Sequence, residues 1–359
     1  MRIHRPRKSR DRVAVTAVIP CYNYGKYLSE VVQSVLSQEH VDVRVIIVDD
    51  ASTDRSAVIA GDLASEDSRI TVIVHPDNQG HIATYNDGLA RVTTPYCMLL
   101  SADDLLAPQS LARATDLMVA NPRVGMVYGR PVDFTDNDRE PDVPKTLVST
   151  WTVWGGHEWI RLASIRGRCF ILSPEVIMRT AAMREIGYYN PQLPHSGDLE
   201  YWLRMASRWD IGRINGPAQA FYRVHGTNMH LVSFSSIATD LSHRQKAFQV
   251  LCTPAGPKDR EYGRAMNMRA RRALAREALI LAQRELDSGG NRKNAVRLAE
   301  VATAANQAAE GSLRYRIFRC QLQRSEAGRT PGFPQKLAEF SRSQIDRMRW
   351  RIWKAVGIS

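Results

Sequence analysis

Two pairs of adjacent aspartates are the residues of this sequence with the clearest capacity for chemistry. Asp49-Asp50 follows the apolar run VDVRVIIV, and Asp103-Asp104 follows the apolar run YCMLL and two small residues. Neighbouring carboxylates repel one another and raise each other's pKa unless a cation neutralises them. Carboxylate oxygens with few other ligands favour a hard divalent ion, Mg²⁺ or Mn²⁺, which commonly binds together with phosphates.

The first pair also has a simpler interpretation. Ser52, Thr53 and Asp54 follow it, and these residue types form turns and helix N-caps. A carboxylate at Asp50 would equally suit an imino N–H of a uracil, thymine or guanine ring, which donates a hydrogen bond. From this segment alone, a solvated helix cap and a nucleobase site have equal weight.

Apolar runs of strand length alternate with segments of helical periodicity between residues 13 and 130. Strands are predicted at 13–20, 43–48, 70–74, 96–100 and 125–128, and helices at 28–36, 56–64, 83–90 and 110–120. This alternation predicts βαβ units and a mostly parallel sheet. Ligands of such sheets bind beyond the carboxyl ends of the strands, so both aspartate pairs should lie at one ligand-binding edge.

Four motifs give the sequence a family resemblance. In chain order they read VIPCYNYGKYL, VIIVDDASTD, NQGHIATYNDGLA and MLLSADDLLAP, and they resemble those of the family 2 glycosyltransferases. The resemblance covers roughly residues 13–230, and the occurrence of four motifs in the family order makes it specific. It implies a GT-A fold, an inverting and metal-dependent reaction, and a nucleotide-sugar donor.

The resemblance assigns residues to the donor site. In the family, the first loop and the acid after the second strand hold the nucleobase, and a DxD-type motif binds the ribose and the metal on the diphosphate. The implied nucleotide-sugar-binding residues are Pro20, Tyr22, Asp49, Asp50, His81 and Asp103. The implied metal ligands are Asp104, Asp103 and His225.

Three of these assignments keep an alternative. Ser101 stands where many members have the first acid of the motif, so either Asp103 or Asp104 binds the metal; Asp104 is favoured, with Asp103 near the ribose. His81 is at least as consistent with a surface histidine in its loop. His225 belongs to YRVHGTNM, which resembles the stretch that closes the family's catalytic domain, and either it or Arg223 would contact the diphosphate or the metal.

The segment HSGDLEYWLR places a carboxylate at the start of a predicted helix. Leu199, Trp202 and Leu203 share one helical face, so Asp198 lies in or just before the first turn. There it can cap the helix, because the first backbone amides lack partners. In the family, the acid of the matching motif is the general base that takes the acceptor's proton. The resemblance therefore implies Asp198 as the base and Glu200 as the alternative, and capping does not exclude catalysis.

Charge is distributed unevenly along the 359 residues. Residues 1–12 carry a net charge of +5, residues 13–240 of −7 and residues 241–359 of +14. An acidic body with basic ends is not the pattern of a nucleic-acid-binding core. The five cysteines include no CxxC pair, which disfavours a zinc site or a disulfide framework and predicts a cytoplasmic protein. The sequence contains no apolar run of about 18 residues, so no membrane-spanning helix is predicted.

The same patterns divide the chain into five parts. They are a disordered basic arm (1–12), a nucleotide-sugar-binding half (13–130), an acceptor-binding half (131–232), a helical region (233–330) and a basic amphipathic helix (331–359). The last part combines arginines, two tryptophans and an apolar face, which is typical of a helix lying on an anionic membrane. Packing of this helix on the domain fits equally well, so peripheral attachment to the inner face of the membrane is one of two outcomes.

These observations predict an inverting glycosyltransferase with Mn²⁺ or Mg²⁺ as cofactor. A carboxylate that accepts an imino N–H favours a UDP, dTDP or GDP sugar, and the acceptor is a hydroxyl of a glycan, a lipid-linked saccharide or a small molecule. One alternative is a non-catalytic scaffold that binds nucleotide or glycan, supported by Ser101. The other is a sugar-phosphate nucleotidyltransferase, which would need a glycine-rich loop where PCYNYG has a single glycine.

Overall fold

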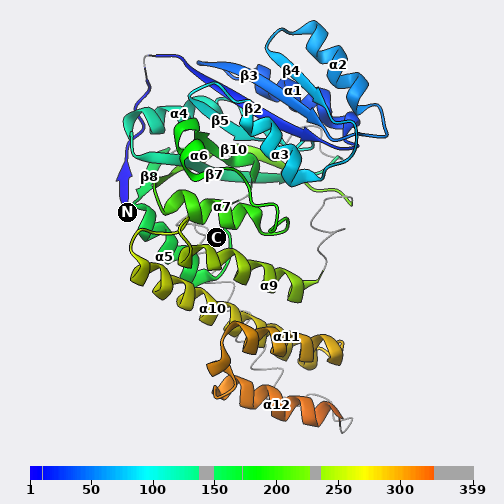
Figure 1. The fold of residues 1–359 in the computed structure, drawn as a ribbon, viewed down its shortest axis with the longest axis vertical. Helices are drawn as coiled ribbons and strands as arrows, with labels where there is room; N and C mark the ends of the chain where they lie inside the picture. Colours follow the sequence, from blue (N-terminus) through cyan, green and yellow to red (C-terminus); the bar gives the residue numbers. More distant parts are fainter. Residues whose placement is uncertain (10, 137–148, 172, 227–235, 327–359) are drawn as a thin grey trace. The chain divides into compact units, whose positions relative to one another are not determined.

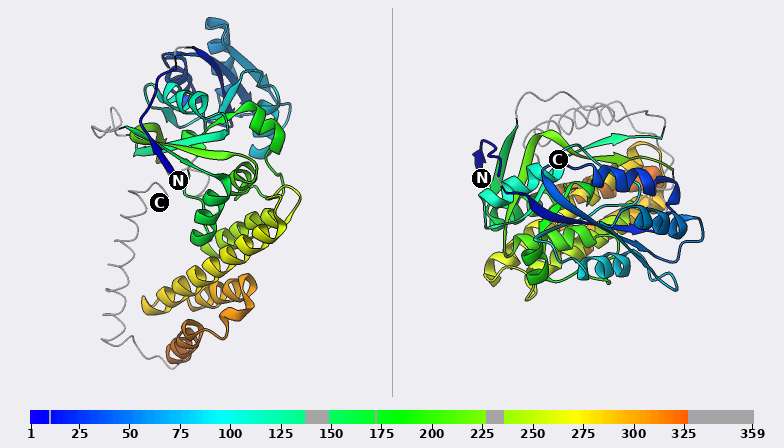
Figure 2. Two further views of the ribbon diagram at one scale, coloured as in Figure 1. Left: turned by 90° about the vertical axis from the view of Figure 1, so that its left-hand side faces the viewer. Right: turned by 90° about the horizontal axis from the view of Figure 1, so that it is seen from above.

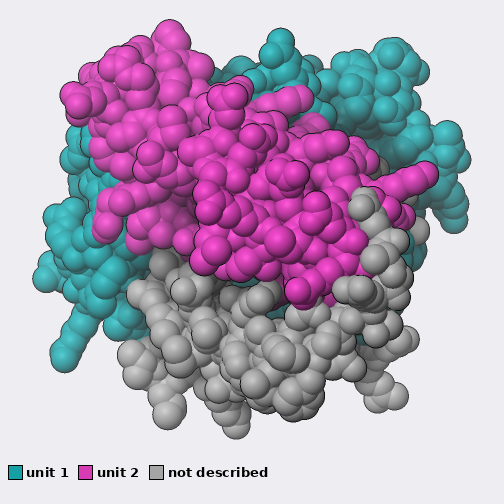
Figure 3. All heavy atoms as spheres, turned by 90° about the horizontal axis from the view of Figure 1, so that it is seen from below, with its two compact units in different colours: residues 1–159, 171–231 teal, residues 160–170, 232–359 magenta. Residues whose placement is uncertain are grey.

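The computed structural model describes residues 1–9, 11–136, 149–171, 173–226 and 236–326. The predicted C-terminal amphipathic helix and residues 137–148 lie outside these ranges. The chain divides into two compact units: unit 1 comprises residues 1–159 and 171–231, and unit 2 comprises residues 160–170 and 232–359 (Figure 3). No helix within the described ranges combines the length and apolar character that crossing a bilayer requires.

Unit 1 is built on one ten-stranded sheet, as far as the structure describes it. The strands are β1 (Arg2–His4), β2 (Val13–Cys21), β3 (Val41–Asp49), β4 (Ile70–Val74), β5 (Tyr96–Leu99), β6 (Leu105–Leu106), β7 (Val124–Phe134), β8 (Thr150–Trp154), β9 (Ile177–Arg179) and β10 (Asp210–Arg223). Their order is β1-β8-β10-β7-β9-β5-β2-β3-β4, with β6 paired to β10. Pairs β2–β3, β3–β4, β2–β5 and β7–β10 are parallel, and the other pairs are antiparallel.

Helices connect and cover these strands (Figure 1). They are α1 (Gly25–Leu36), α2 (Ser56–Glu66), α3 (His81–Ala90), α4 (Ser110–Ala120), α5 (Gly156–Arg166), α6 (Thr180–Ile186) and α7 (Gly197–Ala206), with a 3-10 turn η1 (Ser173–Glu175) before β9. The predicted strand–helix alternation up to residue 120 is confirmed. The boundary between units 1 and 2 falls within α5.

The apolar run of β3 alternates between the two faces of the sheet. Val43, Val45 and Ile47 point into the core that α1 also lines. On the opposite face, Gly88 of α3 packs so closely that an added Cβ would lie 2.3 Å from the Val18 side chain. The helix therefore approaches the carboxyl half of the strands because this position lacks a side chain.

The N-terminal segment corrects one expectation. Residues 1–12 were expected to form a disordered arm, but Arg2–His4 forms β1 and pairs antiparallel with β8, Ile3 opposite Thr152. An edge strand offers free backbone N–H and C=O groups to any extended segment, so this pairing needs no apolar pattern. A basic composition alone could not reveal it.

The antiparallel half of the sheet returns the chain to the aspartate edge. The predicted strand at residues 125–128 extends to Phe134 as β7, and β10 runs parallel to it with Arg223 opposite Phe134. Two register shifts flank Ala218 in β10. These irregularities hide the strand's length in the sequence, where only its last residues show a strand pattern.

Unit 2 is helical over its described residues after 235, which confirms the predicted C-terminal helical extension. The helices are α9 (Ile237–Phe248), α10 (Arg260–Asp287), α11 (Arg292–Ala305) and α12 (Leu313–Glu326), with 3-10 turns η2 (Gln249–Cys252) and η3 (Gln307–Ala309). Figure 2 shows α10, α11 and α12 following one another in yellow to orange. Asp259 caps α10 by accepting a hydrogen bond from the Tyr262 amide, and Asn291 caps α11 in the same way.

Candidate donor and catalytic site

Asp50 lies just after β3 and holds the loop that follows β4. Its Oδ1 accepts a hydrogen bond from the Gln79 amide at 2.8 Å, and its Oδ2 accepts one from the Gly80 amide at 2.9 Å. His75 Nδ1 lies 2.8 Å from Oδ1, and the Asp50 residue is only 3% exposed. The carboxylate predicted to bind a nucleobase thus holds a loop at the carboxyl ends of the strands. We call this edge of the sheet, which carries both aspartate pairs, the donor edge.

His75 is a site residue that the sequence analysis missed. Its ring is buried and bridges two carboxylates, because Nε2 lies 3.3 Å from Asp87 Oδ2. Burial lowers the pKa of His75, but the hydrogen bonds and charges of Asp50 and Asp87 outweigh it, so the pKa is raised. Burial by itself would raise the pKa of Asp50. The hydrogen bonds from His75, Gln79 and Gly80 outweigh burial, so the pKa of Asp50 is lowered.

Replacing His75 with glutamine should destabilise the protein in a pH-dependent way. A raised folded-state pKa means that the histidine contributes stability that is full below its ordinary pKa and is lost as pH rises through the raised value. The lowered pKa of Asp50 keeps the partner ionised throughout that range. We expect a loss of about 2 kcal/mol in the free energy of unfolding at pH 6. Urea unfolding at pH 6 and pH 9 tests this, and an equal loss at both would contradict it.

Asp49 and Asn23 join the first two loops of the donor edge. Asp49 is 1% exposed, and its Oδ1 accepts a hydrogen bond from the Ser52 amide at 2.9 Å. Its Oδ2 is buried without a hydrogen-bond partner among the residues described. Asn23 Oδ1 accepts a hydrogen bond from the Thr53 amide at 2.8 Å, and the φ of Asn23 is 59°. The two loops therefore form one unit.

The predicted base-binding residues differ in their access to a ligand. Tyr22 is 44% exposed at the tip of the joined loops. Pro20 lies within β2, opposite Val48 of β3, and Asp49 and Asp50 are buried. The structure thus leaves Tyr22 as the one side chain of this set with an exposed ring surface for stacking.

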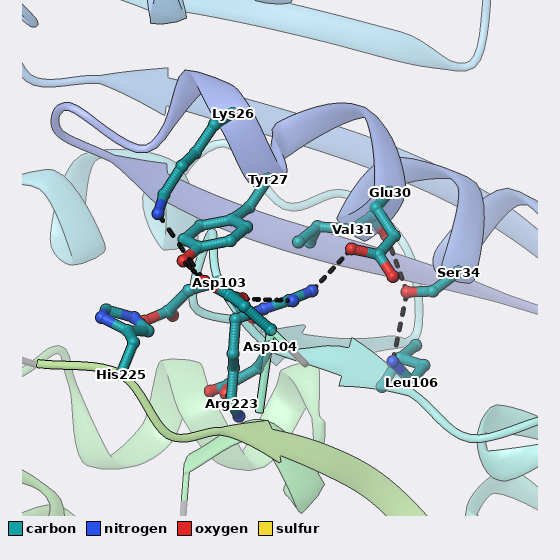
Figure 4. A network of polar contacts seen from close by, with 11 residues as sticks. Lys26, Tyr27, Glu30, Val31, Ser34, Asp103, Asp104, Leu106, Arg223 and His225 are labelled. Atoms are coloured by element: carbon teal, nitrogen blue, oxygen red, sulfur yellow. Dashed lines mark hydrogen bonds and ion pairs between the residues drawn. The ribbon is translucent and has the colours of Figure 1, made fainter. Parts of the chain in front are cut away.

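Asp103 and Asp104 follow β5 and are held by the end of β10. The Arg223 amide donates a hydrogen bond to Asp104 Oδ1 at 2.9 Å, and Arg223 Nε donates one to the Asp103 carbonyl at 2.8 Å. His225 Nε2 lies 3.0 Å from Asp103 Oδ2 (Figure 4). The structure therefore brings together the three residues that the family resemblance implied as metal ligands.

The Arg223 side chain is buried and engaged by neighbouring side chains. It is 5% exposed, and its Nη2 lies 2.6 Å from Glu30 Oε2 and its Nη1 2.9 Å from Asp136 Oδ1. Its guanidinium lies 4.4 Å from the ring centroids of both Tyr27 and Phe134. Figure 4 shows the arginine with Glu30 and Tyr27. The expectation of a diphosphate contact is therefore corrected for Arg223: this side chain positions the aspartates.

The aspartate pair has the electrostatics of a cation site. Burial raises the pKa of Asp104 well above its ordinary value, and the charge of Asp103 raises it further. Within the described ranges, no group of three or more His, Cys, Asp and Glu side chains has metal-ligating geometry. Mg²⁺ is commonly held by only one or two carboxylates together with substrate phosphates, so the pair fits such an ion if a diphosphate supplies the remaining oxygens.

Asp198 lies in the first turn of α7, and its charge acts on the same tyrosine as the charges of Asp103 and Asp104. Burial raises the pKa of the Tyr85 hydroxyl, and the negative charges of Asp198, Asp103 and Asp104 raise it further. The predicted base and both predicted aspartate metal ligands therefore act on the pKa of one tyrosine. Burial also raises the pKa of Tyr189, and the negative charge of Asp198 raises it further.

A side-chain clamp connects the donor edge with the loop that leads to α7. Asn86 Nδ2 donates a hydrogen bond to the Tyr189 carbonyl at 2.9 Å, and the Tyr189 amide donates one to Asn86 Oδ1 at 2.8 Å. His81 Nε2 lies 3.0 Å from the Pro194 carbonyl, so its ring also braces this loop. Helix α3 thus links the loop held by Asp50 to the segment that carries Asp198.

Glu200 is not placed to act as a base. It is 4% exposed, and its two oxygens lie 2.8 and 3.0 Å from Nε and Nη2 of Arg204. The same arginine donates to the carbonyl of Tyr188 at 2.7 Å. Since both Glu200 oxygens are used in a buried ion pair that fixes the loop before α7, this alternative to Asp198 is corrected by the structure.

The residues missed by the sequence analysis carried weak signals. His75 and Pro76 directly follow an apolar strand, and a histidine at the carboxyl end of a strand beside two acidic loops is a plausible partner for Asp50. Tyr85 and Asn86 lie within the third motif but resemble ordinary helix residues. Nothing in their spacing indicates that they face the segment before α7.

The chain is similar to known glycosyltransferases. Residues 16–180 match the model of glycosyl transferase family 2. An uncharacterized glycosyltransferase of Nostoc sp. is 25% identical over 249 residues, which is 66% of this chain and 72% of that protein. The chain spans less than half the length of the next two curated relatives, 46% and 41%.

Two solved structures share the fold. Crystalline S. aureus TarS 1-349 in complex with UDP-GlcNAc is similar with a TM-score of 0.62 and 14% identity, covering 88% of this chain and 92% of that one. The mannosyltransferase PcManGT from Pyrobaculum calidifontis, in complex with GDP-Man and Mn²⁺, is similar with a TM-score of 0.51 and 17% identity, covering 88% and 85%. These likenesses confirm the predicted fold, a GT-A α/β domain with C-terminal helices. With its motifs in family order, the region 16–180 matches the model of glycosyl transferase family 2, and the chain is similar to that family over this region.

Proposed function

We propose that this protein moves a sugar from a nucleoside-diphosphate sugar to an acceptor hydroxyl, with inversion at the anomeric carbon. The proposal is supported by the contact of His225 with Asp103 beside Asp104, and by the pKa of Tyr85, which burial raises and which the charges of Asp198, Asp103 and Asp104 raise further. A transferase of this kind needs a base on the acceptor side and a cation site on the diphosphate side. In this proposal Asp198 would meet the first need, and Asp103 with Asp104 would meet the second.

In this proposal the donor lies across the joined loops. Tyr22 stacks on the base, and the loop held by Asp50 and His75 forms its floor. Asp103 and Asp104, with His225 beside them, would hold Mn²⁺ or Mg²⁺. The bound ion offsets the negative charge that develops on the departing diphosphate. UDP, dTDP and GDP sugars are the candidate donors, in line with the UDP-GlcNAc and GDP-Man bound by the two similar structures.

Asp198 would act on the acceptor side. Its carboxylate accepts the proton of the acceptor hydroxyl as that oxygen attacks the anomeric carbon from the face opposite the nucleotide. An α-linked donor then gives a β-linked product. The acceptor would be a glycan, a lipid-linked saccharide or a small molecule. Attachment of the protein to a membrane through residues 331–359 remains a prediction, as does its cytoplasmic location.

A thermal-shift screen tests the donor site first. UDP, dTDP, GDP and their sugars are each added with Mn²⁺, Mg²⁺ or EDTA. A nucleotide present at about 100 times its dissociation constant should raise the free energy of unfolding by about 2.7 kcal/mol, because it binds only the folded state. We expect one base to give a shift that EDTA removes.

The negative outcome is equally informative. If no nucleotide shifts the melting temperature with either metal, the aspartate edge is not a donor site and the proposal fails. If one nucleotide binds but its sugar is never released to water or to an acceptor, the protein is a non-catalytic scaffold of the same fold. Release of free sugar from the donor, measured by chromatography, separates these two cases.

A further inference from the structure

A second concave surface of unit 1 lies away from the donor edge. A cavity of about 650 Å³ opens over the amino halves of β2, β3 and β4. Four arginines line it, Arg12, Arg44, Arg69 and Arg91, and the single acidic residue among its lining is Asp42. We call this surface the arginine groove. From Arg44 to Asp49, five residues along β3, the distance is about 17 Å, so the groove is separate from the donor edge.

The groove lies where α3 does not cover the sheet and where the exposed positions of β3 are charged. Asp42 and Arg44 alternate with the core residues Val43 and Val45, so they point to the face on which α3 packs. Helix α3 covers that face near Val18 and Val48, towards the carboxyl ends. Both Asp42 and Arg44 are exposed. Charged residues thus replace the apolar pattern at the amino half of β3, beyond the part of the sheet that α3 covers.

The ion pairs of the groove leave much of its positive charge available. Arg12 Nε lies 3.2 Å from Asp42 Oδ1, and both side chains are about two-thirds exposed, 65% and 63%. Arg69 pairs with Asp67, and Arg91 pairs with Asp87, neither of which lines the groove. The single contact of Arg12 with Asp42 is an exposed pair that contributes little stability, whereas Arg69 holds Asp67 through both of its oxygens.

Arg44 differs from the other three arginines. Its backbone pairs with Thr16 of β2, but no hydrogen bond or ion pair joins its side chain to any part of the chain that the structure describes. A side chain that neither packs in the core nor pairs on the surface contributes little to the fold. Its guanidinium stands at the middle strand of the three, with five N–H donors free for a ligand.

The arrangement of the arginines indicates the class of ligand. Arg12 and Arg69 immediately precede β2 and β4, Arg44 lies in β3 between these strands, and Arg91 follows α3. Adjacent strands lie about 4.8 Å apart, so one small anion cannot contact all four arginines. A guanidinium fork pairs well with phosphate, and a phosphate offers three acceptor oxygens to donors that arrive from several directions. We propose that the arginine groove binds an extended ligand that carries several phosphate groups, at a site distinct from the donor edge.

Calorimetric titration with inorganic tripolyphosphate tests this proposal. The full chain is titrated in EDTA at low salt, so that no metal assists binding at the donor edge. The variant Arg44→Gln should bind at least fivefold more weakly than the wild type, because it removes one unpaired charge. The double variant Arg44→Gln with Arg91→Gln should bind more weakly still. Raising the salt concentration should weaken wild-type binding more than that of either variant.

Arg272→Gln provides the matched control. Arg272 is exposed on α10 in unit 2 and loses the same charge on substitution, so its binding of tripolyphosphate should stay within twofold of the wild type. Equal weakening by Arg44→Gln and Arg272→Gln would show that tripolyphosphate senses only the net charge, and would overturn the proposal. Unchanged binding by Arg44→Gln would also overturn it.

Two further arms exclude other locations and occupants. If Asp104→Asn changes tripolyphosphate binding and Arg44→Gln does not, the ion binds at the donor edge and the groove proposal is wrong. If Arg44→Gln reduces pelleting with vesicles that contain anionic lipid, but leaves tripolyphosphate binding unchanged, the groove is a membrane contact and the phosphate-chain proposal is again wrong. Because these readouts measure binding and not turnover, they stand or fall separately from the proposed transferase activity.

Discussion

Asp198→Asn is expected to lower the turnover number by about 10²- to 10⁴-fold, the range typical of a lost general base. Asparagine keeps the size of the side chain and can still face the first amides of α7, so the fold should persist. Donor binding should change little, because the base acts on the acceptor hydroxyl. Steady-state kinetics with the donor identified by the thermal-shift screen, together with the melting temperature of the variant, measure both expectations.

Glu200→Gln is the matched control, two residues along the same helix. Its carboxylate is in a buried bidentate ion pair with Arg204, so its loss should act on stability. Breaking a buried pair by removing one charge costs about 3–5 kcal/mol. We expect a lower melting temperature and near-normal turnover at temperatures where the variant is folded. Normal turnover of Asp198→Asn would refute the assignment of Asp198 as the base. A selective loss of turnover in Glu200→Gln would assign the role of the base to Glu200.

Asp104→Asn is expected to separate the stability of the protein from its response to metal. The raised pKa of Asp104 means that ionising it costs free energy in the folded state at pH values above its unfolded pKa. Asparagine removes that cost and keeps an oxygen to accept the Arg223 amide. In EDTA at pH 7.5 the variant should therefore be at least as stable as the wild type. This advantage should shrink as pH falls below about 4, where the carboxyl of the unfolded chain is also protonated.

The same variant should lose its response to Mn²⁺ and nucleotide. Without the second carboxylate, metal-dependent donor binding should weaken at least tenfold and turnover should fall by several hundredfold, about 3–4 kcal/mol of transition-state stabilisation. Urea unfolding in EDTA and titration of nucleotide with Mn²⁺ give the two readouts.

Asp136→Asn is the control for this prediction, because Asp136 contacts Arg223 and Tyr27 in the same network. Its metal response should be retained. If Asp104→Asn also keeps the metal response and Asp103→Asn loses it, Asp103 is the ligand. If all three variants respond as the wild type does, the cation site lies elsewhere.

Much of the fold of residues 13–130 could be predicted because its signals are local. A strand such as β3 shows itself by consecutive β-branched residues, and a helix such as α4 by the spacing of its apolar side chains. Parallel βαβ units then bring the ends of β3 and β5 to one edge without any knowledge of side-chain contacts. The position of Asp49, Asp50, Asp103 and Asp104 at one edge was therefore readable from the order of the elements.

The partners of those acids were not readable, because they arise from contacts between distant positions. Arg223 binds the Asp103 carbonyl from 120 residues away, and it does so only because β10 pairs with β7. His75 and Glu200 show the same limit: each looks like a loop or helix residue, and only packing makes one the anchor of Asp50 and the other the partner of Arg204. Local periodicity reports which segments are strands and helices, whereas the hydrogen bonds that commit a carboxylate to structure or leave it for chemistry depend on which segments meet in three dimensions.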